Sequence, residues 1–210
     1  MIPINKLSNA ILLEIFASYI DQSQLAKRST KRTIEAWQTL VHVCRRWRSI
    51  GFASPHRLNL QLVVTPEMPA IDTLDIWPAF PLVVKGHVSE TRLDNIISVL
   101  QRNGNRVCQI DLDGLTKTQL DEISSVTLGR FPELRDLKLG GHYGVMSFDN
   151  KAFLGGSVPP RLQSLSLDRI PLLRLPKLLS SASQLVHLRL SGFPISRNTS
   201  PKNWRLPFLH

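Results

Sequence analysis

The sequence contains little cysteine, few acidic side chains and no long apolar run, and these shortages exclude several classes of protein. Only two of the 210 residues are cysteines, so a disulfide framework like those of small secreted domains is excluded. No run reaches the ~18 apolar residues of a membrane-spanning helix. The N-terminus lacks the charged start, apolar stretch and small-residue cleavage site of a signal peptide. We therefore expect reduced thiols, no membrane association, and a location in the cytoplasm, the nucleus or both.

The charge is strongly basic. The chain has 26 basic and 16 acidic side chains, a net charge of +10. Residues 1–56 hold eight of the basic and three of the acidic ones, so the excess is densest there. Such an excess suits an acidic partner or a nucleic acid. Aromatic side chains are not interleaved with the basic ones, as a base-stacking surface requires, so a nucleic-acid partner is disfavoured.

No set of catalytic or metal-binding residues is recognisable. The glycine-rich stretches "LGGHYGV" and "FLGGS" lack the Gly-Lys-Ser/Thr of a phosphate loop. A Gly-x-Ser-x-Gly elbow and a His-Glu-x-x-His helix are both absent, and the six histidines share no metal-ligand spacing. We expect no enzymatic activity, no cofactor and no metal.

Two stretches near the N-terminus have helical spacing. Apolar side chains recur every three or four residues after Ser8, a good N-cap, and predict a helix over 9–20 with a very wide apolar arc. The polar stretch 21–33 predicts a loop. A second helix is predicted over 34–50. Cys44 lies on the apolar face of this second helix, so we expect it to be a small buried apolar side chain rather than a reactive thiol. The neighbouring arginines lie off that face and are expected to be solvated.

These two stretches resemble an F-box, the short helical module by which adaptor subunits join cullin-based ubiquitin ligases. The resemblance rests on "LSNAILLEIFASYI" (7–20) followed by "LVHVCRRWRSIGFASPHRLNL" (40–60). It departs at Ser8, where the family usually has proline, and in the length of the 21–33 loop. The resemblance implies that residues 1–56 bind a Skp-type adaptor and, through it, a cullin ligase. The implied adaptor contacts are Leu7, Ile11, Leu12, Ile15, Phe16, Val43 and Trp47.

An internal repeat occupies the second half of the chain. Four segments fit the pattern apolar-x-x-apolar-x-Leu: "VCQIDL", "LRDLKL", "LQSLSL" and "LVHLRL", beginning at residues 107, 134, 162 and 185. Their spacing lies within the roughly 20 to 29 residues of leucine-rich repeats. The repeat predicts parallel strands in an α/β solenoid over 57–196. Additional strands are predicted at 57–64 and 82–84, and helices at 89–103, 118–128 and 175–182. The helix at 118–128 is expected to begin with a capping box of Thr118 and Asp121.

The repeats resemble the irregular leucine-rich repeats that follow the F-box in many fungal proteins. The family's polar residue, three positions after the last leucine, is replaced here. The replacing residues are Leu115, His142, Ile170 and Phe193. We therefore expect an irregular curvature. For the atypical tail 197–210 two hypotheses stay open: a sequence shortened by truncation, alternative splicing or a gene-model error, or a native tail whose apolar side chains cover the last repeat.

Alternate side chains of the predicted strands point away from the core and form a polar concave surface. This surface is either ordinary solvated sheet or a face that binds a target protein. The predicted target contacts are Asp111, Asp113, Asp136, Lys138, Asp168, His187 and Arg189. The sequence thus predicts a non-enzymatic adaptor that holds a target beside a ligase. Two alternatives are a stand-alone repeat protein, whose N-terminal helices cap the solenoid with Ile11, Ile15 and Trp47 buried, and a nucleic-acid-binding protein whose affinity falls steeply with salt.

Overall fold

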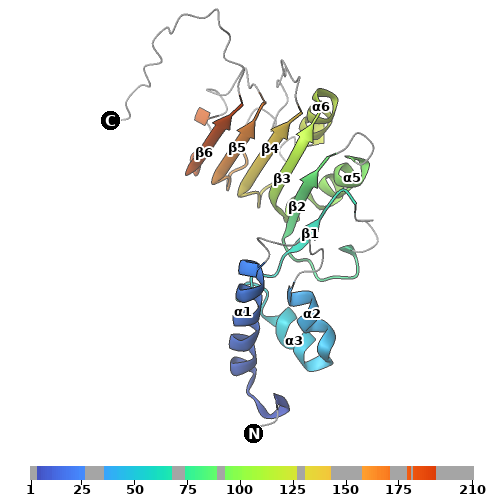
Figure 1. Ribbon diagram of the computed structural model, residues 1–210, viewed down its shortest axis with the longest axis vertical. Coiled ribbons are helices and arrows are strands. Elements are labelled where there is room, and N and C mark those ends of the chain that lie inside the picture. The colour runs from blue at the N-terminus through green and yellow to red at the C-terminus, as the bar shows by residue number, and fades with distance from the viewer. Residues whose placement is uncertain are drawn as a thin grey trace, which may run out of the picture.

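A computed structural model describes residues 4–26, 36–67, 74–88, 93–126, 131–142, 158–170, 179–180 and 182–192. These residues form a small helical module and one open, six-stranded sheet (Figure 1). The strands are all parallel and follow the order β1-β2-β3-β4-β5-β6, so each strand lies beside its predecessor in the sequence. The predicted α/β class with parallel strands is confirmed. The interpretation of this sheet as a leucine-rich-repeat solenoid stays a prediction.

The helical module lies beyond the β1 edge of the sheet (Figure 1). It contains a 3-10 turn, η1 (Ile4–Lys6), and the helices α1 (Asn9–Ala26), α2 (Ala36–Val43) and α3 (Arg45–Ala53). The predicted start of α1 is confirmed, because the Ser8 hydroxyl accepts a hydrogen bond from the Ile11 amide at 3.3 Å. The helix continues past residue 20, where the sequence predicted its end.

The prediction of a single helix over 34–50 is wrong. Cys44 has an extended backbone, with φ −158° and ψ 169°, and separates α2 from α3. The break turns the side chain of Cys44 away from the core, so the predicted burial of this thiol is also wrong and Cys44 is exposed. The core of the module is therefore formed by α1 together with two short helices, α2 and α3. Its buried side chains are Leu12, Phe16, Ile20, Trp37, Leu40, Val41 and Ile50.

The six strands are β1 (Leu62–Val64), β2 (Leu82–His87), β3 (Val107–Leu115), β4 (Asp136–Gly141), β5 (Ser164–Asp168) and β6 (His187–Ser191). Each of the four repeated segments runs into one of the strands β3 to β6, as predicted, but in β4, β5 and β6 the first two residues of the segment precede the strand. β1 is shorter than the predicted strand over 57–64, because the chain turns there: Asn59 has a positive φ of 46°, and the Leu60 amide donates to the carbonyl of Pro55.

Two helices pack on the leucine-bearing face of the sheet, while at the far edge Leu188 of β6 remains 43% exposed. They are α5 (Leu93–Asn103), which continues into the 3-10 turn η3 (Gly104–Arg106), and α6 (Lys117–Val126). The predicted capping box is displaced by two residues. Thr116 and Gln119 form it instead: the Thr116 amide donates to Oε1 of Gln119 at 2.9 Å, and the Gln119 amide donates to Oγ1 of Thr116. Most of the predicted helix 175–182 and all of the tail 197–210 lie outside the described residues.

Candidate functional site

The wide apolar arc of α1 is divided between the core and the surface. Its inner stripe packs against α2 and α3 and consists of Leu12, Phe16 and Ile20. Its outer stripe, which we call the α1 stripe, is formed by Ile11, Ile15 and Tyr19, which are 49%, 42% and 43% exposed. Residues four apart in a helix share one face, so the α1 stripe is a continuous apolar strip.

The structure separates the predicted adaptor contacts into two groups. Ile11, Ile15 and Val43 are exposed, and Leu7 is half-buried. The side chains of Leu12 and Phe16, in contrast, are 0% and 1% exposed, because they face the other two helices.

Trp47 is half-buried, with its ring 4.8 Å from that of Phe16. The predicted surface role of Leu12 and Phe16 is therefore corrected to a core role. Sequence reasoning missed Tyr19 as a surface residue, although it continues the four-residue spacing of the stripe.

Two of the arginines predicted to be solvated also form hydrogen bonds within the module, although Arg48 is exposed as predicted. Arg46 donates through Nη2 to the carbonyl of Leu7 at 2.5 Å and to Oδ1 of Asn9 at 2.9 Å. Arg48 donates through Nε to the carbonyl of Val41 at 3.1 Å. These bonds hold the start of α3 against the start of α1, and therefore fix the Val43 end of α2 beside the N-terminal end of the α1 stripe.

The side chains of the sheet's uncovered face form three rows, in the register that the sequence predicts. The first row is Gln109, Asp136, Ser164 and His187, and the second is Asp111, Lys138, Ser166 and Arg189. The third is Asp113, Gly140, Asp168 and Ser191. The pairing of β2 with β3 adds Lys85 to the second row and His87 to the third, which the sequence did not predict.

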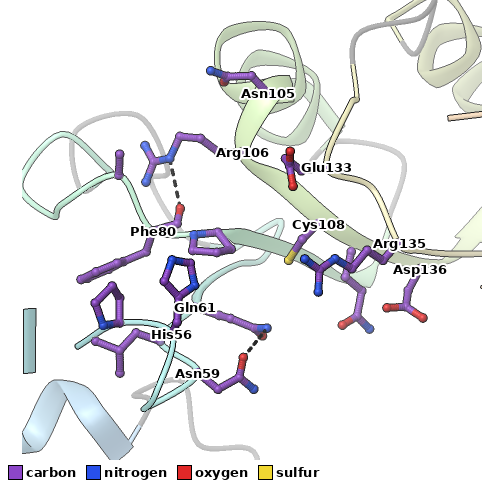
Figure 2. A pocket seen from close by; sticks show the side chains of 15 residues that line it. His56, Asn59, Gln61, Phe80, Asn105, Arg106, Cys108, Glu133, Arg135 and Asp136 are labelled. Carbon is purple, nitrogen blue, oxygen red and sulfur yellow. Dashed lines mark hydrogen bonds between the residues drawn. The ribbon is translucent and has the colours of Figure 1, made fainter. Parts of the chain in front are cut away.

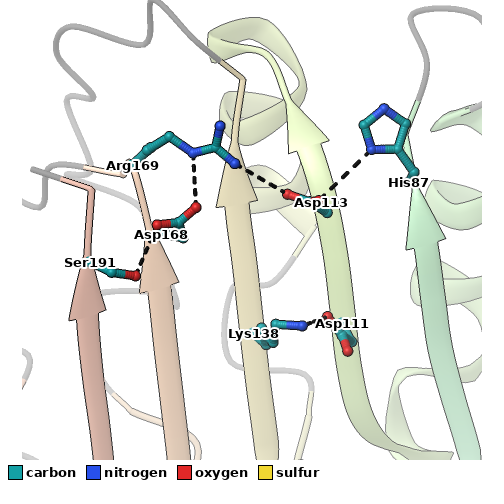
Figure 3. A network of polar contacts seen from close by, with 7 residues as sticks. All are labelled: His87, Asp111, Asp113, Lys138, Asp168, Arg169 and Ser191. Atoms are coloured by element: carbon teal, nitrogen blue, oxygen red, sulfur yellow. Dashed lines mark hydrogen bonds and ion pairs between the residues drawn. The ribbon is translucent and has the colours of Figure 1, made fainter. Parts of the chain in front are cut away.

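A network of polar contacts links the side chains of the third row to one another and to Arg169 (Figure 3). Arg169 lies between two carboxylates, with Nε 2.8 Å from Oδ2 of Asp168 and Nη2 3.8 Å from Oδ1 of Asp113. His87 approaches Asp113 from the opposite side at 3.9 Å. Ser191 donates to Asp168 at 2.9 Å, and this bond, followed by the contacts with Arg169, lowers the pKa of the Asp168 carboxyl.

Gly140 makes this network geometrically possible. A Cβ atom at this position would lie 2.2 Å from Oδ1 of Asp113, so a residue with a side chain would displace that carboxylate from β4. In the second row Lys138 and Asp111 pair with each other at 2.9 Å. Four of the seven predicted target contacts are thus engaged within the chain.

The other three predicted target contacts are Asp136, His187 and Arg189. Among the described residues their side chains have no hydrogen bond or ion pair.

A polar groove of about 530 Å³ lies where the strands begin (Figure 2). Its walls come from the turn at 55–61, the segment 79–81, η3, and the starts of β3 and β4. Arg106 is fixed in one wall by donating to the carbonyls of Phe80 and Pro78, and burial lowers its pKa. The Cys108 thiol donates to the carbonyl of Leu82, and burial raises its pKa, so this thiol is not primed for reaction. No sequence motif marks the groove, because the segments that build it are far apart in the chain.

Comparisons with known proteins assign neither a family nor a function to this chain. No protein-family model matches the chain, and no curated protein or solved structure is significantly similar to it. The described part of the chain contains no group of three or more His, Cys, Asp or Glu side chains placed to hold a metal ion. Within the same segments, no helix combines the length and the hydrophobicity that crossing a bilayer requires.

Proposed function

We propose that the chain is an adaptor subunit of a cullin-based ubiquitin ligase. In this proposal residues 1–56 act as an F-box that binds a Skp-type adaptor, and the sheet, as an irregular leucine-rich-repeat unit, binds a target protein. The ligase would then act by proximity, because holding the target beside the ubiquitin-charged machinery raises their effective concentration without chemistry in this chain.

The observation that carries the proposal is the α1 stripe. Ile11, Ile15 and Tyr19 present a continuous apolar strip to solvent in the same stretch that resembles an F-box. An amphipathic helix that docks in a partner's groove does so through residues at this spacing, and the buried aromatic and aliphatic side chains supply most of the affinity. A Skp-type adaptor that covers the α1 stripe would remove it from water.

The junction between module and sheet supports the second half of the proposal. The Trp37 indole donates through Nε1 to the carbonyl of Gln61 at 3.0 Å. Its ring also makes edge contacts with Trp77 and Phe80, at centroid distances of 5.2 and 5.5 Å. These contacts join α2 to the segments that enter β1 and β2. A target bound to the sheet would therefore be held at a fixed position relative to the adaptor.

The stand-alone alternative requires Ile11 and Ile15 to be buried within the chain, and their exposure favours the adaptor proposal. Co-expression of the chain with a Skp-type adaptor, followed by size-exclusion chromatography, tests it. We expect one complex with the unaltered chain and with Val186→Asp, which places the same charge on an exposed apolar residue far from α1. We expect no complex with Ile15→Asp. A soluble, folded chain that never elutes with the adaptor would refute the proposal.

A further inference from the structure

The polar groups of the sheet face differ in what they can offer a ligand. Toward the ends of the strands, the carboxylates of Asp113 and Asp168 already share contacts with the single guanidinium of Arg169. A ligand would have to break those contacts, and an ion pair that loses a partner leaves a charge uncompensated. At the beginnings of the strands the side chains of Gln109 and Arg135 have no hydrogen bond or ion pair among the described residues. The groove of Figure 2 is therefore a part of this face whose polar groups are available, as those of His187 and Arg189 on β6 also are.

The groove is lined by two guanidiniums, those of Arg106 and Arg135, and by two carboxylates, those of Glu133 and Asp136. The guanidinium of Arg135 points back over Cys108 toward its centre (Figure 2). Arg106 adds a second guanidinium, fixed by backbone carbonyls rather than by a carboxylate. The carboxylate of Glu133 is paired with Arg161 at 2.5 Å, whereas that of Asp136 has no ion pair among the described residues and offsets one of the two positive charges. An anionic group that enters the groove meets a net excess of one positive charge, and the guanidinium of Arg135 forms no ion pair within the described segments.

The remaining walls suit a polypeptide. Gln109 and Asn105 present amide side chains, which can both donate to and accept from a peptide backbone. Gln109 and Asp136 also belong to the first row of the sheet face, so an extended segment can leave the groove across β4 and β5. The phenyl ring in the groove wall, that of Phe80, is 4% exposed, so it offers no ring face on which a nucleic-acid base can stack.

We propose that this groove binds an acidic, extended segment of a protein, with Arg135 taking a side-chain carboxylate of the ligand and Gln109 and Asn105 bonding to its backbone. The assignment of that segment to a ubiquitination target rests on the proposed function. The binding itself does not, because it needs only this chain.

The test is an NMR titration of the full-length, ¹⁵N-labelled chain without any adaptor. The probes are the peptide acetyl-Gly-Glu-Gly-Glu-Gly-amide, its lysine counterpart, and a single-stranded uridine oligonucleotide. We expect the acidic peptide to shift the amide signals of Gln109, Arg135 and Asn105, and the lysine peptide to shift none of them. Arg135→Ala should weaken acidic-peptide binding by at least about tenfold, since a charge-assisted bond is lost.

Lys117→Ala is the matched control, because it removes one positive charge from the exposed start of α6 at the other end of β3. It should bind the acidic peptide as the unaltered chain does. The proposal is overturned if neither peptide binds, if the lysine peptide binds equally, or if Arg135→Ala has no effect. Tighter binding of the oligonucleotide than of the acidic peptide at the same residues would overturn it in favour of a nucleic-acid site. Because no adaptor is present, these outcomes are independent of whether the α1 stripe binds a Skp-type protein.

Discussion

Ile15 and Phe16 are neighbours on α1, and their replacement should have very different effects on stability. Phe16 is fully buried and contacts the Trp47 ring, so Phe16→Ala removes a core aromatic and leaves a cavity. Such truncations cost about 3–5 kcal/mol of unfolding free energy. Ile15 is 42% exposed, so Ile15→Asp loses only partial burial, which amounts to about 1 kcal/mol.

Urea unfolding followed by tryptophan fluorescence and by circular dichroism measures both changes. With a slope of about 2 kcal/mol per molar urea, the midpoint should fall by about 2 M for Phe16→Ala and by about 0.5 M for Ile15→Asp. Ser18→Asp is the control for placing an aspartate in α1, because Ser18 is also exposed on that helix. If Ile15→Asp lowered the midpoint as far as Phe16→Ala does, the α1 stripe would be covered by the chain itself, and the division of α1 into two stripes would be wrong.

Three further predictions concern the sheet and the cysteines. In the folded chain, Ser191 lowers the pKa of Asp168, so the ionised carboxylate stabilises the fold at neutral pH and this stabilisation is lost as the pH falls below the ordinary carboxyl pKa of 3.8. Asp168→Asn should therefore lower the urea midpoint at pH 7 more than at pH 3. Iodoacetamide should modify the exposed Cys44 before Cys108, whose pKa is raised by burial; peptide mass spectrometry measures the order. Gly114→Ala should lower the urea midpoint by the equivalent of at least ~1 kcal/mol, because Gly114 has a φ of +76°.

Each of these predictions has an outcome that contradicts it. An Asp168→Asn chain that stays less stable than the unaltered chain by the same margin at pH 3 would show that the effect is not the loss of a carboxylate. Faster modification of Cys108 than of Cys44 would contradict the extended backbone at residue 44. An unchanged urea midpoint for Gly114→Ala would contradict the left-handed backbone conformation of Gly114.

The repeat strands could be predicted because their pattern is local and repeated. The last two leucines of "LRDLKL" and of "LQSLSL" are two residues apart, and this period of two places them on the core side of the sheet and the polar residue between them on the other side. The same period predicted the rows of the uncovered face in register. The start of α1 was predictable for a similar reason, since Ser8 is a strong N-cap whose bond is local.

The features that the sequence did not predict depend on contacts between distant residues. Helical spacing continues through Cys44, and nothing local marks the break there. The break accompanies contacts from the arginines beyond it, since Arg46 bonds to the carbonyl of Leu7, far away in the chain. The wide arc of α1 could not be divided into inner and outer stripes until α2 and α3 were placed. The groove combines a turn, a 3-10 helix and two strand starts, so only the folded arrangement shows it.

The dissociation constant between the purified chain and a purified Skp-type adaptor tests the central claim most directly. It is measured by isothermal titration calorimetry on the unaltered chain, on Ile15→Asp and on the Val186→Asp control. The proposal predicts saturable one-to-one binding for the unaltered chain and the control, with a loss of at least about tenfold for Ile15→Asp, since a buried apolar anchor is replaced by a charge. No binding by the folded, unaltered chain, or equal binding by Ile15→Asp, would contradict the claim that the α1 stripe is an adaptor-docking surface.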